Sequence, residues 1–191
     1  MVVFVLPRLL IPVESTPGET RVAATPDTVK KFLSFGCDVS VERGAGTTSG
    51  YLDQAYADQG AQLIDPGDAA GWSEADISLC VQPPSAASLA RLRQGALVVG
   101  LLSPYANEEL TASLKRGALS AMALELLPRI SRAQSADALS SQANIAGYKS
   151  VLLASAALDR YFPMLMTAAG TVQPAKVVIL GAGAVSYTHL R

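Results

Sequence analysis

The chain has 191 residues, of which 50% are hydrophobic and 16% are charged, and its formal net charge at pH 7 is −1. Fifteen Lys and Arg against sixteen Asp and Glu leave no basic surface for nucleic acid or anionic lipid, so we expect no nucleic-acid partner. This length and apolar content exclude a disordered or fibrous chain and favour one large or two small domains with a buried α/β core.

The amino-terminal run, MVVFVLPRLLIPVE, is apolar but does not resemble a secretion signal. It has no basic start, and Pro7 and Arg8 interrupt it before any cleavage site. No segment reaches the ~18 uninterrupted apolar residues of a membrane span. Cys37 and Cys80 match no metal-binding or C-x-x-C spacing, which indicates reduced structural thiols. These features predict a soluble cytoplasmic chain without a metal site.

Short apolar runs then alternate with helical patterns. Thr25 is the expected N-cap of the first helix, Pro26 suits its first turn, and Gly36 ends it. Strands separated by helices of this length predict βαβ units and a doubly wound, mostly parallel α/β sheet over residues 1–127. The predicted strands are 9–13, 38–42, 62–65, 77–81, 96–102 and 118–124, and the predicted helices are 25–36, 52–59, 85–95 and 106–116.

The composition changes after Pro128. Residues 137–161 are rich in Ala and Ser at helical spacing, which predicts a long helix within a connecting segment, 128–165. A loop follows Pro163, and then the strand-like KVVIL (176–180) runs into a Gly-Ala-Gly sequence. Residues 166–191 are therefore interpreted as the start of a Rossmann domain.

In that glycine motif, Gly181 permits the tight turn and Gly183 lets the backbone approach a pyrophosphate. The third position of the fingerprint is Ser186, and the acidic residue expected ~20 positions later falls beyond residue 191. Taken alone, the motif fits a plain strand-to-turn glycine pair as well as a cofactor site.

The loop PRISRAQSADALSS, which starts at Pro128, is unusually polar. Arg129 and Arg132 can donate to phosphate or amide oxygens, and Gln134 with Asp137 suits a carboxamide. The alternative is a solvated loop in which Ser135 or Asp137 caps the next helix, and composition alone favours this alternative.

A second polar cluster, Glu19-Thr20-Arg21, follows the end of the first strand, where α/β folds bind ligands. By itself it fits a surface salt bridge better. Oxidation of an alcohol or amine by NAD requires a general base, usually His or Lys. The one histidine is His189, close to the chain end, and the strand end VQPP offers Gln82 but no lysine. A reaction at this site has to proceed without a side-chain proton acceptor.

Four segments stand out together: ETRVAATP (19–26), VERGAG (41–46), PRISRAQSADALSSQANIAGYKSVL (128–152) and MTAAGTVQPAKVVILGAG (166–183). Together they resemble one family, the NAD(H)-binding alpha subunit of the proton-translocating NAD(P)+ transhydrogenase. The resemblance covers about residues 10–185, and its most specific part is the RISRAQS-to-GYK block. Alanine dehydrogenase shares the fold and the E-x-R-V-x-x-x-P segment, so that segment does not discriminate between the two.

The resemblance implies that the polar loop holds the nicotinamide ring and its carboxamide, with Arg129, Gln134 and Asp137 as the binding residues and Ser140 nearby. Hydride transfer between NADH and NADP+ leaves no proton to remove, so neither a catalytic acid or base nor a metal is expected; positioning and exclusion of water suffice. The implied cofactors are NAD(H) on this chain and NADP(H) on a partner subunit.

The implied partners are the membrane and NADP-binding subunits and a second alpha subunit in a homodimer. This arrangement places the chain at the cytoplasmic face of the inner membrane. Two alternatives remain. An alanine dehydrogenase-like enzyme needs a lysine and a histidine in its cleft, whereas this chain has Gln82 and no histidine around 100–106. A non-catalytic interaction fragment would use the small-residue helix 138–157.

The family pattern breaks after residue 185. The last six residues, SYTHLR, resemble translated sequencing-adapter DNA and are interpreted as non-native, and residues before Leu9 are interpreted as an extended start. The chain is therefore expected to be an N-terminal fragment that is inactive by itself.

Overall fold

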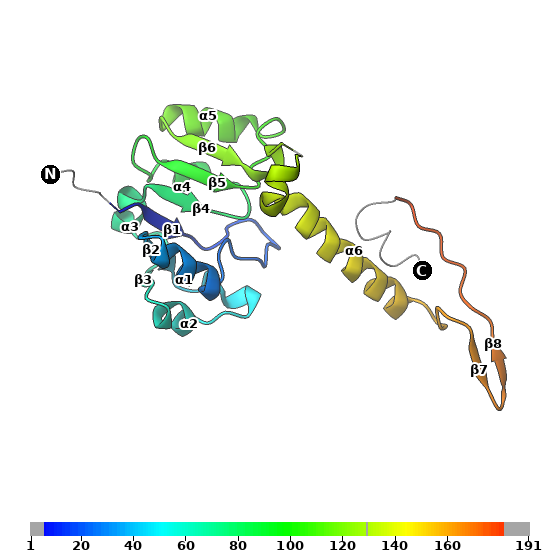
Figure 1. Ribbon diagram of the computed structural model, residues 1–191. Helices are drawn as coiled ribbons and strands as arrows, with labels where there is room; N and C mark the ends of the chain where they lie inside the picture. Colours follow the sequence, from blue (N-terminus) through cyan, green and yellow to red (C-terminus); the bar gives the residue numbers. More distant parts are fainter. Residues whose placement is uncertain (1–5, 129, 182–191) are drawn as a thin grey trace. The chain divides into compact units, whose positions relative to one another are not determined.

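The computed structural model describes residues 6–128 and 130–181. The chain separates into two compact units, Met1–Leu127 and Pro128–Arg191, and each is described by itself (Figure 1). Arg129, Gly183 and the tail 186–191 with His189 lie outside the described residues.

The first unit is built on a six-stranded sheet in which every pairing is parallel. The strand order is β3-β2-β1-β4-β5-β6, so the chain runs outward from β1 to β3 and then returns to the other side of β1. This order confirms the predicted doubly wound fold and creates a topological switch point between β1 and β4. The strands are β1 (Arg8–Ile11), β2 (Asp38–Glu42), β3 (Gln62–Ile64), β4 (Ile77–Leu79), β5 (Leu97–Gly100) and β6 (Ser120–Ala123).

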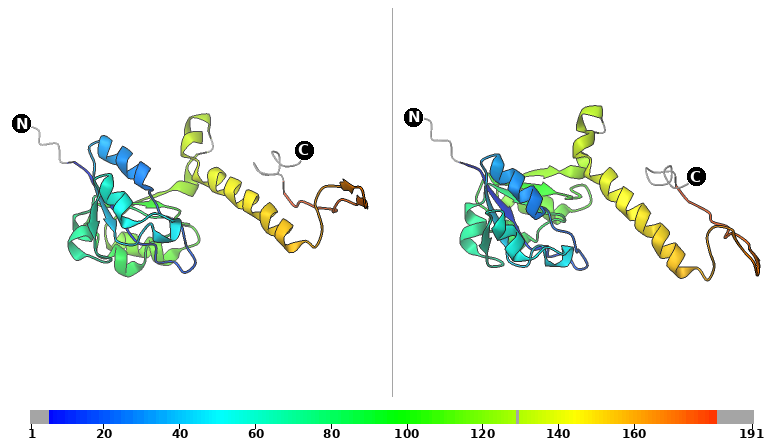
Figure 2. Two further views of the ribbon diagram at one scale, coloured as in Figure 1. Left: turned by 90° about the horizontal axis from the view of Figure 1, so that it is seen from below. Right: turned by 60° about the horizontal axis from the view of Figure 1, so that its bottom comes forward.

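Helices cover both faces of this sheet, and the alternation of β1 shows how. Leu9 and Ile11 pack in a core cluster with residues of α1 (Pro26–Ser34) and α2 (Asp53–Asp58). Leu10 points to the opposite face and packs with residues of α3 (Ala69–Glu74), α4 (Ala86–Leu89) and α5 (Glu108–Arg116). Figure 2 shows α1 and the α4–α5 pair on opposite sides of the sheet.

The helix boundaries follow local chemistry. Thr25 Oγ1 accepts a hydrogen bond from the Thr28 N–H at 3.3 Å, and Pro26 begins α1, as predicted. The prediction of a helix over 85–95 was too long, because after Leu89 the Arg91 and Leu92 amides bond to the carbonyls three residues back, which tightens the chain into turns. Helix α3 was missed, although Asp68 caps it by accepting from the Gly71 N–H.

The second unit holds α6 (Ala138–Ala157), a 20-residue helix as predicted, in which no residue is buried. Two short strands, β7 (Leu165–Thr167) and β8 (Gly170–Val172), form an antiparallel hairpin where a plain loop was expected. The predicted strand KVVIL (176–180) is not formed: this segment has no ladder partner within residues 130–181, and a strand is stable only when paired.

Short 3₁₀ helices complete the chain at Thr47–Ser49 (η1), Leu124–Leu126 (η2) and Ser131–Ala136 (η3). Cys37 and Cys80 are free thiols. Among the residues that the structure describes, no helix is long and apolar enough to cross a membrane.

Candidate functional site

The carboxyl ends of β1 and β4 meet at the switch point of the sheet, and Glu14 joins them. One oxygen of its carboxylate accepts the Val81 N–H and the other accepts the Gln82 N–H at 3.0 Å. Burial raises the pKa of Glu14 above its usual 4.5, even though both amide hydrogen bonds oppose the shift. The loop after β1 is thereby fixed to the end of β4.

Glu19 and Arg21 form a two-pronged ion pair beside this junction. Arg21 Nε and Nη2 donate to the two Glu19 oxygens at 2.8 and 2.6 Å, and the Arg21 N–H donates to Oε1 at 3.0 Å. The Glu19 side chain is 7% exposed and that of Arg21 is 39% exposed. The Arg21 guanidinium lowers the pKa of Glu19 to about 2, and Glu19 in turn raises the pKa of Arg21. This is more than the surface salt bridge that the sequence favoured.

Gln82 completes the cluster. Its side-chain Nε2 donates to Glu19 Oε2 at 2.9 Å, while its main-chain N–H is held by Glu14. Glu14 and Gln82 line a recess of about 90 Å³ together with Pro12, Val13 and Pro84. The switch point thus has a polar wall in which each side chain is fixed by another.

Two more carboxylates hold strand ends at the same edge of the sheet. Glu42, at the end of β2, is buried and accepts from the Val13 N–H, the Gly67 N–H and Trp72 Nε1 at 2.7 to 2.8 Å. Glu125, just after β6, accepts the main-chain N–H groups of Leu102 and Ser103 in the loop after β5. Neither residue was identified from the sequence; the available signal was an acidic residue directly after an apolar strand.

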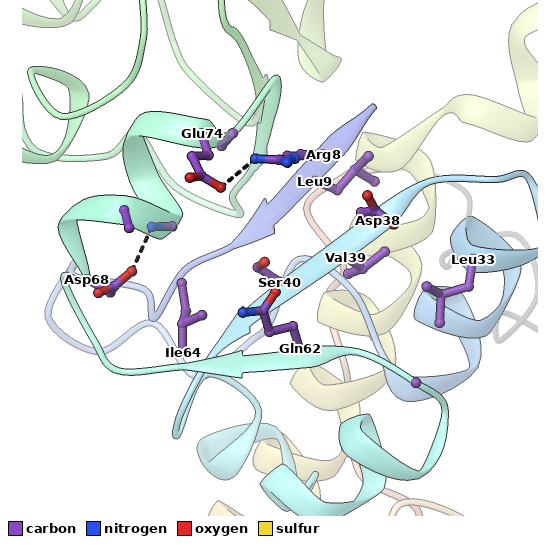
Figure 3. Close-up of a pocket in the computed structure, with 14 residues that line it drawn as sticks. Arg8, Leu9, Leu33, Asp38, Val39, Ser40, Gln62, Ile64, Asp68 and Glu74 are labelled. Carbon is purple, nitrogen blue, oxygen red and sulfur yellow. Dashed lines mark hydrogen bonds and ion pairs between the residues drawn. The ribbon is translucent and has the colours of Figure 1, made fainter. Parts of the chain in front are cut away.

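A larger hollow of about 440 Å³ lies elsewhere, along the first residues of β1, β2 and β3 (Figure 3). Asp38, Ser40 and Gln62 line it from the sheet, and it is also lined by Asp68, the N-cap of α3, and by Glu74, the last residue of α3. Parallel α/β sheets bind ligands at the carboxyl ends of their strands. This hollow begins at the amino ends, so we do not assign it to the site.

In the second unit, the loop predicted to bind the nicotinamide forms η3 and leads directly into α6. Asp137 caps the helix: its Oδ1 accepts the Ser140 N–H at 2.9 Å and its Oδ2 accepts the Ser140 hydroxyl at 2.6 Å. Gln134 is exposed in η3. The structure therefore brings Gln134, Asp137 and Ser140 into one short segment, where Asp137 has the capping role that composition favoured.

Gly181 has φ +124, a conformation that disfavours any other residue, and a Cβ at this position would meet nothing within 4 Å. Its open backbone suits the turn of a Gly-x-Gly motif. Within the part of the chain that the structure describes, no group of three His, Cys, Asp or Glu side chains could hold a metal ion.

Comparison with known proteins gives consistent matches along the chain. The N-terminal domain of the alanine dehydrogenase/PNT family matches residues 10–146, and the C-terminal domain of that family matches residues 150–190. In Rhodospirillum rubrum, the polypeptide named as the first part of NAD(P) transhydrogenase subunit alpha is 42% identical over 181 residues, which are 92% of this chain and 47% of the relative.

Two further proteins separate the branches of that family. The crystal structure of transhydrogenase from Sinorhizobium meliloti matches with a TM-score of 0.88 and 46% identity over 94% of this chain and 53% of that chain. Alanine dehydrogenase of Mycobacterium tuberculosis is more distant, at 32% identity over 96% of this chain and 50% of the relative. The chain spans about half the length of these relatives.

Proposed function

The chain belongs to the alanine dehydrogenase/PNT family, and on this premise we propose that it is the N-terminal part of an NAD(P) transhydrogenase alpha subunit. In the proposed function the subunit binds NAD(H) and passes hydride between NADH and NADP+, while membrane partners translocate protons. NADP(H) is bound by a partner subunit, and two alpha subunits form a homodimer at the cytoplasmic face of the inner membrane.

The observation that carries this proposal is the state of the polar wall at the switch point. Glu19 has a pKa of about 2 and is bound by Arg21, and Gln82 carries no charge. Glu19 and Gln82 keep one protonation state throughout the neutral range, so these two side chains can position a ligand but cannot exchange protons with it. The other acid of the wall, Glu14, has both carboxylate oxygens bonded to the main-chain N–H groups of Val81 and Gln82. Hydride transfer between two nicotinamides needs such positioning and no proton acceptor.

The bound nicotinamide supplies or accepts the hydride; the residues of this chain bind and orient it. In the loop before α6, the exposed Gln134 amide offers a donor and an acceptor that match a carboxamide. Asp137 is held by Ser140, which fixes the carboxylate at the start of the helix. We assign Arg129 as a further donor in this loop.

At the other end of the cofactor, Gly181 and Gly183 would let the main chain approach the pyrophosphate. The open backbone of Gly181 supports this assignment. The exposed Gln134 amide and the held Asp137 carboxylate support the proposed contact with the ring, and the open backbone of Gly181 supports the proposed contact with the phosphates.

The test is made with the full-length subunit that carries this segment, assembled with its membrane and NADP-binding subunits. We expect the complex to transfer hydride from NADH to NADP+. The transfer is measured with an NADP+ analogue as the acceptor, by the change in absorbance of that analogue. Absence of this transfer in a folded complex that binds NADH would contradict the proposal, and NAD+-dependent oxidation of alanine by the subunit would replace it with the alanine dehydrogenase alternative.

A further inference from the structure

We propose that Gln82 binds the carboxamide of a nicotinamide ring, with its side-chain oxygen Oε1 as the acceptor for the carboxamide N–H. This inference deepens the proposed function and rests on it. The proposed contact lies within the first unit, where the wall formed by Glu14, Glu19, Arg21 and Gln82 lines the switch point.

Gln82 is held at two places before any ligand arrives. Its main-chain N–H donates to Glu14, and its side-chain Nε2 donates to Glu19. Glu19 is itself fixed by two guanidinium contacts from Arg21. A side chain restrained in this way loses little further freedom on binding, so a hydrogen bond to it contributes more to affinity.

The same contacts decide which end of the Gln82 amide points outward. Glu19 has a pKa of about 2 and is ionised at neutral pH, so its carboxylate can only accept hydrogen bonds. The amide NH₂ must therefore face Glu19, and the amide oxygen faces the other way. Among the described residues Oε1 of Gln82 has no hydrogen-bond donor, so it remains an acceptor beside the recess that Gln82 lines.

The charge of the wall selects the ligand. Two carboxylates, Glu14 and Glu19, face one guanidinium, Arg21, which leaves the cluster negative when both are ionised. A carboxylate or phosphate brought to Gln82 would meet this charge and a hydrogen-bond acceptor. A ligand with an amide N–H can donate to Oε1 of Gln82, and a neutral or positively charged aromatic ring avoids repulsion by the wall. Nicotinamide has both the amide N–H and such a ring.

The inference is tested on the 191-residue chain labelled with ¹⁵N. Three compounds are added to the chain in separate titrations: nicotinamide, nicotinate, and 3-acetylpyridine, which keeps the ring and the carbonyl but lacks the NH₂. Each is raised to tens of millimolar, a concentration range that reveals weak binding of small fragments. The readout is the side-chain amide resonance of Gln82, identified by its loss in Gln82→Met, and the main-chain resonance of Val81. Gln94→Met, at an exposed position outside the wall, is the matched control.

We expect nicotinamide to shift both resonances saturably and the other two compounds to bind about tenfold more weakly, the effect of one lost hydrogen bond of ~1.4 kcal/mol. Gln82→Met should lose this preference and Gln94→Met should keep it. Shifts equal in size for nicotinate and nicotinamide, no shift at Gln82, or an unchanged preference in Gln82→Met would each overturn the inference.

The carboxamide could come from NAD(H) or from NADP(H), and the assembled enzyme separates these sources. Wild type and Gln82→Met are compared with the 3-acetylpyridine analogue of NAD+ and, separately, with that of NADP+. In the wild type, the analogue of the dinucleotide that Gln82 binds should work less well than the natural dinucleotide, and in Gln82→Met this difference should disappear. If the difference disappears for neither dinucleotide, the inference fails. Wild-type hydride transfer in the same assay would show that the proposed function stands even then.

Discussion

At the scale of single residues, Glu19 links the stability of the fold to pH. Its folded-state pKa of about 2 lies below its usual value of 4.5, because Arg21 stabilises the charged form. The stabilisation is therefore present above about pH 4.5 and is lost as the pH falls toward 2. Glu14 acts in the opposite sense. Because its folded-state pKa is raised, its contribution to stability is present at low pH and is lost as the pH rises through the folded-state pKa.

The first prediction follows from the lowered pKa of Glu19. Glu19→Gln should lower the free energy of unfolding at pH 7 by about 1–3 kcal/mol, since it removes charged hydrogen bonds from a nearly buried side chain. Near pH 2 the difference should shrink to a few tenths of a kcal/mol, because about half of the folded molecules then carry a protonated Glu19. Denaturant unfolding at both pH values measures this, with exposed Glu109→Gln as the control. An equal loss at the two pH values would rule out the ion pair as its source.

The second prediction separates binding from capping in the loop before α6. Asp137→Asn keeps a good N-cap but removes the charge, so the melting temperature should hold while hydride transfer in the assembled enzyme slows by about 10–100-fold. Gln134→Asn and Arg129→Ala should slow transfer similarly, with a much smaller loss of NADH affinity.

The control for this set is Asp137→Ala, which removes both the charge and the cap. It should add a loss of ~1 kcal/mol in stability. If Asp137→Asn and Gln134→Asn transfer hydride at the wild-type rate per folded molecule, the loop only caps its helix.

At the scale of elements, carboxylates organise the carboxyl edge of the sheet, the edge at which parallel α/β sheets bind ligands. Glu14, Glu42 and Glu125 each accept main-chain N–H groups from a loop that follows a strand. Loops at this edge have no ladder partners, so buried N–H groups there need other acceptors. The pattern explains how irregular segments can hold Gln82 and Glu19 in fixed positions.

The third prediction tests the most buried of these carboxylates. Glu42→Gln leaves one oxygen and a donor where three N–H groups require acceptors, so it should destabilise the first unit by about 2–4 kcal/mol. Arg43→Ala, at the exposed neighbouring position, should change stability by less than ~0.5 kcal/mol. Thermal unfolding of the two variants side by side is sufficient, and similar melting temperatures would contradict the bridging role.

Sequence periodicity predicted the six strands of the sheet and the four helices α1, α2, α4 and α5, because alternating apolar residues and helix caps are local signals. It missed α3, whose sequence AAGWSE has no apolar stripe, and it extended α4 because the turns after Leu89 keep helix-like composition. KVVIL was predicted as a strand from composition, whereas strand formation depends on a partner. Within the site, Gln82 and Arg21 were noticed, but their connection through Glu19 spans distant segments and cannot be inferred from sequence spacing.

At the scale of the whole molecule, the neutral side chain of Gln82 gives a test between the proposed function and the alanine dehydrogenase alternative. The fourth prediction is that the full-length subunit will not oxidise alanine with NAD+ above background. Gln82 is neutral and bound to Glu19, so it cannot accept the proton that amine oxidation releases. NADH production with alanine, measured by its absorbance beside an authentic alanine dehydrogenase, provides the test, and clear turnover would contradict the proposed function.

The last prediction concerns association through α6. The helix has no buried residue, and Ile145 and Leu152, which lie two turns apart on one side, are 61% and 47% exposed. Apolar side chains in such a row are stabilised when a second copy covers them, which fits the proposed homodimer. Ile145→Glu and Leu152→Glu should therefore weaken self-association of the chain by about 100-fold or more, since each puts a charge into an apolar contact. Asn144→Glu, on an exposed neighbouring position, should leave association unchanged. Sedimentation equilibrium over a range of concentrations measures all three; a wild-type chain that stays monomeric, or variants that dimerise as tightly as it does, would exclude α6 as the dimer contact.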